Sequence, residues 1–215
     1  MTCAHCVDAA DFFGKGIAQR ELARYRRRGP TRSTQLLLDG VTSLGVEGAS
    51  FLDVGGGIGA VQQELLAAGA SAGTGVDASP AYLASAQAEA RRRGTLDRLT
   101  FLEGDAVELA GELPEVDIVT LDRVLCCYPH MERLVEISCR RSRRIWGAVV
   151  PREDWWIRLG GRLLNGIQAL RGKAFRLYLH GVPRIESAVE ARGFQAVASR
   201  RTWLWEIRVF ARTGV

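Results

Sequence analysis

Four glycines between residues 55 and 59 form the stretch best suited to hold an anionic ligand. The segment Gly55-Gly56-Gly57-Ile58-Gly59 follows an apolar run over residues 49–54 and precedes a helical pattern that starts at Ala60. Glycine tolerates positive φ and leaves no Cβ in the path of a ligand. A helix that starts directly after such a turn offers unpaired N–H groups and a partial positive charge. The sequence therefore predicts a strand, a ligand-binding turn and a helix N-terminus.

Acidic residues follow the next two apolar runs. Asp77 ends the run over residues 72–76, one strand-turn-helix-strand unit after Asp53. An acid at such a strand end accepts hydrogen bonds from ribose hydroxyls, each contributing about 1.5–3 kcal/mol. Asp105, after residues 99–102, suits a helix N-cap when it is considered alone. Asp77 supports an adenosine ligand, and because the glycine turn also fits the dinucleotide fingerprint, NAD and a sulfonium cofactor both stay open.

The acid before the glycines favours the sulfonium cofactor. Asp53-x-Gly55-x-Gly57-x-Gly59 resembles motif I of class I S-adenosylmethionine (SAM)-dependent methyltransferases, and the resemblance spans about residues 49–212. It implies that the acid and the glycines face the methionine end of SAM. It also implies that Asp77 meets the ribose and that Asp105 meets the adenine. The cofactor-binding residues predicted in this way are Asp53, Gly55, Gly57, Gly59, Asp77, Ala78, Asp105, Ala106 and Leu121.

The segment after the fourth apolar run is where the reacting groups are expected. Residues 122–130 follow the strand predicted over 117–121 and resemble motif IV of the same family. In an open parallel sheet this loop borders the ligand at the topological switch point. Methyl transfer needs an aligned nucleophile, and a base only where the acceptor carries a proton. The candidate catalytic residues are His130, His180, Tyr128 and Asp122, with no metal.

Part of the segment over residues 122–130 resembles the corresponding segment of one methyltransferase subfamily. Asp122-Arg123-Val124-Leu125-Cys126-Cys127-Tyr128, together with Asp11-Phe12-Phe13, resembles the magnesium-protoporphyrin O-methyltransferases. The chain differs at Cys126, where those enzymes carry a histidine, and at Phe12, where they carry a tyrosine. The sequence therefore predicts a small-molecule enzyme with a helical lid, without specifying a porphyrin. The candidate substrate-contacting residues are Tyr25, Cys126, Cys127, Trp155 and Trp156.

The cysteines support a further alternative. Cys3 and Cys6 form a C-x-x-C pair, and an N-terminal lid would bring them towards Cys126 and Cys127. Four thiolates could bind zinc or a soft metalloid substrate. The plainer interpretation is that buried cysteines act as small apolar side chains.

The elements that position these residues follow a repeating strand-helix pattern. Two helices, over 12–28 and 32–44, precede the first strand, and residues 1–48 are expected to form a helical lid. Residues 49–215 are expected to form the SAM-binding domain, with an inserted helix over about 153–171. Two final strands, over 194–199 and 203–211, are joined by a turn at 200–202. The fold expected from the resemblance is a Rossmann-like, doubly wound α/β sheet of seven strands in the order 3-2-1-4-5-7-6, with the last strand antiparallel.

Composition limits the alternatives. The chain has 215 residues, 47% of them hydrophobic, and a net charge of +5, which fits one globular domain. Two of the three arginine clusters fall where helices are expected to end, where cations suit the helix dipole. Nucleic acid is not an expected partner, because residues 122–130 lack the Asn/Asp-Pro-Pro-aromatic pattern that clamps a flipped base. No apolar run is long enough to span a bilayer, so a cytoplasmic location is expected. An NAD(P)-dependent oxidoreductase stays as the alternative, and the oligomeric state is not predicted.

Overall fold

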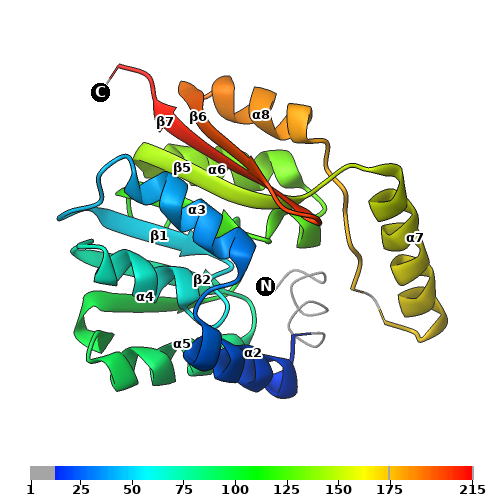
Figure 1. The fold of residues 1–215 in the computed structure, drawn as a ribbon, viewed down its shortest axis with the longest axis horizontal. Coiled ribbons are helices and arrows are strands. Elements are labelled where there is room, and N and C mark those ends of the chain that lie inside the picture. The colour runs from blue at the N-terminus through cyan, green and yellow to red at the C-terminus, as the bar shows by residue number, and fades with distance from the viewer. Residues whose placement is uncertain (1–12, 174, 215) are drawn as a thin grey trace.

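A seven-stranded sheet forms the middle layer of the structure, a computed structural model that describes residues 13–173 and 175–214. Its strand order is β3-β2-β1-β4-β5-β7-β6, as predicted (Figure 1). The strands are β1 Ser50–Val54, β2 Ala72–Asp77, β3 Leu99–Glu103, β4 Val116–Asp122, β5 Ser142–Pro151, β6 Phe194–Arg201 and β7 Trp205–Arg212. Strand β7 pairs antiparallel with both β5 and β6, which confirms the predicted antiparallel last strand.

The central strands are apolar on both faces because helices cover both. Phe51 and Ile118 pack in the core on one face, beneath α3 (Arg32–Thr42) and α4 (Ala60–Ala67). Leu52 and Val119 pack in the core on the other face, beneath α6 (Met131–Arg141) and α8 (Val182–Glu190). All four side chains are fully buried. Two-sided burial of this kind is typical of parallel sheets and leaves the carboxyl edge as the open place for a ligand.

Helix α5 (Pro80–Arg93) shows how local signals set the element ends. The Ser79 hydroxyl accepts from the N–H of Tyr82, Pro80 opens the helix, and Gly94 closes it with φ +69°. All three residue types favour these positions through their own backbone and side-chain preferences, so the ends of α5 are set locally. Two short helices, η1 (Leu96–Arg98) and η2 (Leu125–Cys127), precede β3 and follow β4.

The two N-terminal helices have different environments. Helix α2 (Lys15–Arg28) packs on α5, with Tyr25 buried in a small core that includes Ile58 and Tyr82. Helix α3 packs on β5 and β7, and its Leu37 lies in the core beneath the sheet. Helix α2 therefore borders the carboxyl edge through Glu21, which lines a cavity there. Helix α3 belongs to the layer that covers the sheet and meets the same edge at its first turn, through Thr34.

The turn between the last strands lies later than predicted. Strand β6 continues through Arg200 and Arg201, and the turn falls at residues 202–204. An ion pair between Arg201 and Glu206 extends the ladder, and the N–H of Thr202 donates to the carbonyl of Trp205 at 2.8 Å. Cross-strand charge pairing therefore outweighs the turn preference of a polar sequence.

Helix α7 (Trp155–Leu170) is the inserted helix that the sequence predicts over about 153–171. It leaves the sheet after Pro151 and stands beside the carboxyl edge, before the chain returns to α8 (Figure 1). No helix within the described residues is long and apolar enough to cross a membrane.

Candidate functional site

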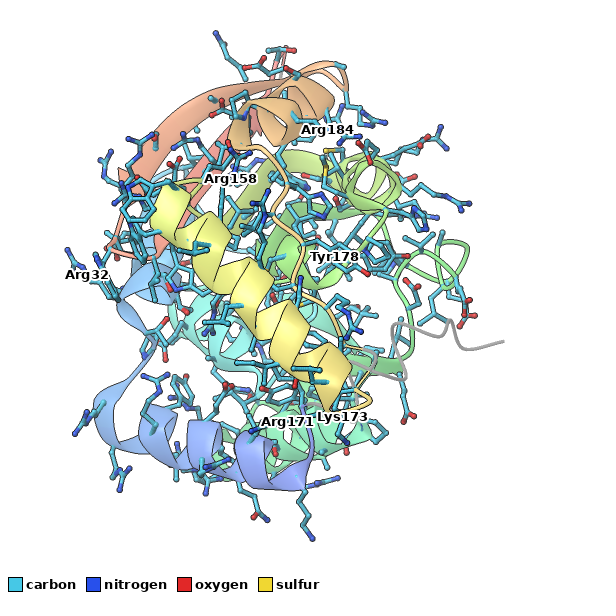
Figure 2. The ribbon with its side chains drawn as sticks, turned by 90° about the vertical axis from the view of Figure 1, so that its right-hand side faces the viewer. Arg32, Arg158, Arg171, Lys173, Tyr178 and Arg184 are labelled. Atoms are coloured by element: carbon cyan, nitrogen blue, oxygen red, sulfur yellow. The ribbon has the colours of Figure 1, made fainter. Side chains whose placement is uncertain are left out.

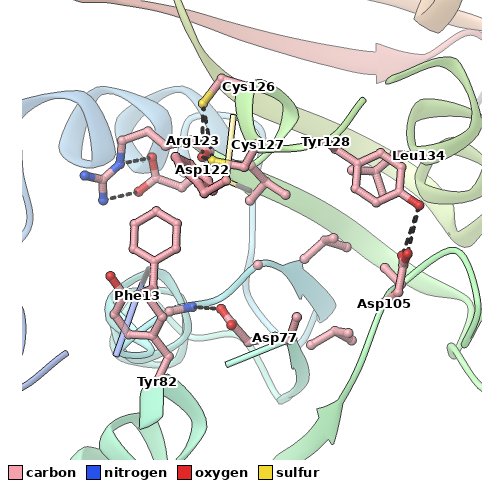
Figure 3. A pocket seen from close by; sticks show the side chains of 18 of the residues that line it. Phe13, Asp77, Tyr82, Asp105, Asp122, Arg123, Cys126, Cys127, Tyr128 and Leu134 are labelled. Carbon is pink, nitrogen blue, oxygen red and sulfur yellow. Dashed lines mark hydrogen bonds and ion pairs between the residues drawn. The ribbon is translucent and has the colours of Figure 1, made fainter. Parts of the chain in front are cut away.

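A cavity of about 380 Å³ opens at the carboxyl edge of the sheet, within the size range of small-molecule sites (Figure 3). The glycine turn and the ends of β2 and β4 line one part of it. The N-terminal segment, α7 and residues 175–177 line another part, through Phe13, Leu164, Phe175 and Leu177. The cavity therefore has a polar wall built from strand ends and an apolar wall built from the segments that cover them.

The glycine turn presents backbone to this cavity. Gly55, Gly57 and Gly59 have φ values of +64°, +54° and +78°. The N–H of Gly55 donates to the Val76 carbonyl at 2.7 Å, which ties the turn to β2. A Cβ built on Gly57 would meet no atom within 4 Å, so open space lies beside its backbone. Gly59 is the N-cap of α4, and a Cβ there would press on Ala86 at 3.1 Å.

Asp77 faces the cavity from the end of β2, next to Ala78. Its two carboxylate oxygens accept from the N–H groups of Gly57 and Ser79, both at 2.8 Å. Burial raises the pKa of Asp77 to about 6, although these hydrogen bonds oppose the increase. A carboxylate has lone pairs left for other donors, so Asp77 can still accept from hydroxyl groups in the cavity.

Asp53 lies behind the glycine turn and is 1% exposed. Thr120 Oγ1 donates to it at 2.7 Å and Gln62 Nε2 at 3.3 Å. Burial raises the pKa of Asp53 to about 7, with the hydrogen bonds opposing and the charges of Asp122 and Asp77 adding to the increase. Asp53 lines a smaller space of about 50 Å³, which borders the main cavity through Gly55 and Gly57.

Asp105 and Tyr128 meet at another end of the cavity. The Tyr128 hydroxyl donates to the Asp105 carboxylate at 2.9 Å, and the N–H of Val107 donates to it at 2.8 Å. Asp105 and Tyr128 are buried, and both line the cavity together with Ala106. Figure 3 shows this pair on the opposite side from Phe13 and Tyr82. Tyr128, predicted as a catalytic residue, thus contacts the acid predicted to meet adenine.

The loop after β4 adopts an unusual backbone conformation at Arg123. With φ +64°, Arg123 is the one non-glycine residue with positive φ among those described, and such a conformation costs about 1–2 kcal/mol. Its guanidinium Nε donates to Asp122 at 3.1 Å, and Thr34 Oγ1 donates to the other oxygen of Asp122 at 2.6 Å. Asp122 and Arg123 line both spaces, so a carboxylate and a guanidinium face the same ligand volume. Leu121, just before them, is fully buried in the core beneath the sheet.

Cys126 and Cys127 lie in the next turn and both line the cavity. Their Sγ atoms are 3.8 Å apart, and both thiols point at the carbonyl of Arg123. The hydrogen bond from Cys126 lowers the pKa of the Cys127 thiol. Cys3 and Cys6, the other half of the predicted thiolate set, lie outside the described residues. Within residues 13–173 and 175–214, no group of three or more His, Cys, Asp and Glu side chains is arranged to hold a metal ion.

The two candidate histidines lie away from the described lining of the cavity. His130 is exposed at the N-cap of α6. His180 Nε2 lies 2.8 Å from the carbonyl oxygen of Tyr128, and the N–H of Tyr178 donates to the Cys126 carbonyl at 2.7 Å. His180 therefore anchors the loop after β4 rather than facing the cavity.

Three aromatic residues predicted to contact substrate are also absent from the described lining of the cavity. Tyr25 is 1% exposed and its hydroxyl donates to Glu64 at 2.5 Å. Trp155 is 76% exposed, and Trp156 stacks on Trp203 with ring centroids 4.8 Å apart. In the described structure, the residue that α7 contributes to the cavity is Leu164.

Several lining residues have no strong sequence signal. Glu21 of α2 and Tyr82 of α5 line the cavity, as do Trp205 at the start of β7 and Leu177. Glu21 is one polar residue in a polar helix, and Trp205 fits an ordinary strand pattern. Arg123 sits inside the predicted loop, but nothing in its neighbours indicates the left-handed conformation.

Comparisons with known proteins agree with this geometry. Residues 51–142 match the family model described as a methyltransferase domain. No curated protein sequence matches the chain significantly. Residues 51–142 contain the glycine turn, Asp77, Asp105 and the loop after β4, so the match covers the polar wall of the cavity.

Solved structures of similar fold extend the likeness to nearly the whole chain. Magnesium protoporphyrin IX methyltransferase from Synechocystis PCC 6803, crystallised with S-adenosylhomocysteine (SAH), has a TM-score of 0.73 at 20% identity, covering 97% of this chain and 100% of that chain. The same enzyme with SAM has a TM-score of 0.69 at 19% identity, covering 98% of each chain. The [4+2]-cyclase SpnF has a TM-score of 0.60 at 18% identity, covering 82% of this chain and 80% of that chain. At these identities the likeness concerns the fold.

Proposed function

We propose that this chain is a class I SAM-dependent methyltransferase that transfers the methyl group of SAM to a small apolar or aromatic acceptor. Residues 51–142 match a methyltransferase domain, and a protein of similar fold has been crystallised with SAM and with SAH, which supports the proposal. The main observation in support of the proposal is that the cavity has one polar wall and one apolar wall. Asp77, Asp105 and the open backbone of Gly57 form one wall, and apolar side chains form the other. A polar cofactor and an apolar acceptor could share such a cavity.

Successive parts of the polar wall suit successive parts of the SAM molecule. Asp105, with the N–H of the following residues, suits the adenine, and the Asp77 carboxylate suits the ribose hydroxyls. Glu21, Asp122 and Arg123 border the smaller space and offer both signs of charge. Carboxylates pair with an amino group and a guanidinium pairs with a carboxylate, so this end suits the zwitterionic methionine part. When bound, SAM supplies an electrophilic methyl group on a sulfonium.

The apolar wall indicates the chemical class of the acceptor. Phe13 and Phe175 meet edge to face, with ring centroids 5.6 Å apart, and Leu164 and Leu177 line the cavity beside them. Such a wall desolvates an apolar acceptor and holds it near the loop after β4. Positioning of this kind can supply much of a methyl-transfer rate, because the sulfonium leaves as a neutral thioether.

Gly57→Ala tests whether the open backbone receives the cofactor. We expect the variant to fold and to bind SAM at least about tenfold more weakly, because the added Cβ occupies the space beside the ligand. Gly94→Ala is the matched control: its φ is +69°, its Cβ would also meet nothing within 4 Å, and it closes α5 away from the cavity. Both variants carry a backbone strain of about 1–2 kcal/mol. Calorimetric titration that gives equal SAM affinities for the two variants would contradict this placement.

Titration of the reduced protein with SAM, SAH and NADH tests the proposed function. We expect SAM and SAH to bind and NADH not to bind. Methyl transfer is then measured as SAH formation with a panel of small phenols, carboxylic acids and thiols. Binding of NADH alone would favour the oxidoreductase alternative, and binding of SAM without transfer to any acceptor class would favour a fold used for binding.

The cysteine pair supports a second candidate, a thiol or metalloid acceptor. Cys126 and Cys127 face the cavity with their Sγ atoms 3.8 Å apart, a separation that one soft atom could bridge. We expect phenylarsine oxide to bind the Cys3→Ser/Cys6→Ser variant, forming two S–As bonds and releasing one water. Mass spectrometry measures the adduct, and Cys139→Ser in the same background is the control, since Cys139 is buried in the core. An adduct that survives Cys127→Ser would reject this candidate.

A further inference from the structure

Helix α7 exposes a row of apolar side chains on the side that faces away from the sheet. Trp155, Leu159, Leu163 and Leu170 are 76%, 59%, 65% and 90% exposed. Residues spaced in this way fall on one face of a helix. We call these four residues the apolar ridge. Exposed apolar side chains scattered singly need no explanation, but a continuous row on one helix marks an interaction surface.

The turn between β6 and β7 extends the ridge. Trp203 is 72% exposed and stacks on Trp156 of α7, with ring centroids 4.8 Å apart and planes at 21°. The stack joins the first turn of α7 to the sheet, so the ridge is continuous with a second exposed tryptophan. Tryptophan is typical of the boundary between water and a lipid bilayer, because its ring is apolar and its N–H is polar.

The inner face of α7 is fixed by polar and steric contacts, so the ridge is not a core face left open. The Asn165 amide donates to the Leu177 carbonyl and accepts from the Leu177 N–H, both at 2.8 Å. Gly161 is buried and allows Leu177 and Leu179 to approach. Ile157 and Gln168 are buried on the same side. Rotation of the helix to hide the ridge would break the paired hydrogen bonds of Asn165.

The residues of α7 itself carry positive charge and no acid, and the N-cap Asp154 is paired with Arg152. Arg158 and Arg162 are the only charged residues of α7, and Arg171 and Lys173 follow its end. All four are exposed, and none forms an ion pair with any residue that the structure describes. Figure 2 looks onto α7, with Arg158 near one end and Arg171 and Lys173 at the other.

We propose that the apolar ridge docks this protein on the surface of an anionic lipid bilayer. The apolar side chains would enter the interface, and the four cations would meet anionic headgroups. A second copy of the chain fits less well, because a two-fold contact through α7 would bring helices that carry only positive charge together. Leu164 of the same helix lines the cavity, so docking would place the helix that borders the cavity at the membrane. The inference does not depend on the identity of the methyl acceptor.

Vesicle flotation of the full, reduced protein tests the proposal. We expect binding to phosphatidylcholine–phosphatidylglycerol vesicles at low salt, and much weaker binding to phosphatidylcholine alone. Leu159→Gln/Leu163→Gln removes two exposed side chains from the ridge and should lower the partition coefficient at least about tenfold. Arg158→Gln/Arg162→Gln should lower binding to the anionic vesicles and remove much of its salt dependence.

Two matched controls separate docking from general effects of substitution. Val197→Gln replaces another exposed apolar residue, 47% exposed on β6, and Arg91→Gln removes an exposed cation from α5. Both should bind vesicles like the unmodified protein. Absence of binding to anionic vesicles, or binding unchanged by Leu159→Gln/Leu163→Gln, would overturn the proposal. A concentration-dependent dimer in sedimentation velocity that this double variant abolishes, without vesicle binding, would assign the ridge to a second copy instead.

Discussion

Asp77→Ala weakens the binding of SAM by about 100-fold or more, if the carboxylate receives the ribose hydroxyls. Two hydrogen bonds to a charged acceptor contribute at least about 3 kcal/mol, which corresponds to this factor. The substitution also releases the N–H groups of Gly57 and Ser79, which the carboxylate holds at 2.8 Å, so the glycine turn loses a contact that shapes it. Calorimetric titration with SAM and SAH measures the loss.

The control for Asp77 is Asp97→Ala, which removes an exposed acid from η1 and should leave SAM affinity unchanged. The pH dependence provides an independent check. Because burial raises the pKa of Asp77 to about 6 in the protein without ligand, the carboxylate gains a proton as the pH falls through that value. SAM affinity should therefore decrease below about pH 6. An Asp77→Ala variant that binds SAM like the unmodified protein would exclude the ribose role.

Asp53→Asn makes the protein without ligand more stable at pH 8, by on the order of 3 kcal/mol, or about 6–12 °C in Tm. Burial raises the pKa of Asp53 from 3.8 to about 7, so ionisation at pH 8 costs free energy in the folded state only. Asparagine has nearly the same shape without the charge. Its Oδ1 can still accept from Thr120, as Asp53 does at 2.7 Å.

Gln62 can adapt to the new amide. Its Nε2 now donates to Asp53 at 3.3 Å, whereas its Oε1 is buried and accepts no hydrogen bond from a described residue. A flip of the Gln62 amide would let Oε1 accept from the Nδ2 of the new asparagine. The flip keeps one hydrogen bond between the two side chains and places Nε2 where Oε1 now has no partner, so the gain in stability comes from removal of the buried charge.

The pH dependence of this gain has a defined sign. Between about pH 4 and pH 7 the folded state binds more protons at Asp53 than the unfolded state, so the stabilising contribution of this group is lost as pH rises. The difference between Asp53→Asn and the unmodified protein should be less than half as large at pH 5 as at pH 8. Urea unfolding at both pH values measures it, with Asp97→Asn as the exposed control. An unchanged or lower free energy of unfolding at pH 8 would contradict the buried charge.

The positions of the central strands and of the glycine turn could be predicted because their signals are local, whereas the strand order was expected from the resemblance to a known family. Phe51 and Leu52 lie in a continuous apolar run, and only a strand covered on both faces buries both. Ser79 and Gly94 cap α5 through their own backbone and side-chain preferences. The turn between β6 and β7 lies later than predicted, because Arg201 pairs with Glu206 across the two strands. The sequence of either strand alone does not reveal this contact.

The sequence by itself determined the ligand-binding edge, since Asp53, Asp77 and the glycines follow strand ends whose positions are set by hydrophobic pattern. Only the tertiary structure decided which loop side chains face the cavity. It directs Tyr128 to Asp105 and His180 to the carbonyl of Tyr128, and it turns Trp155 to solvent. The direction of a side chain in a loop or an inserted helix depends on contacts between segments that are far apart in the chain. The residue types and spacing within one segment do not reveal those contacts.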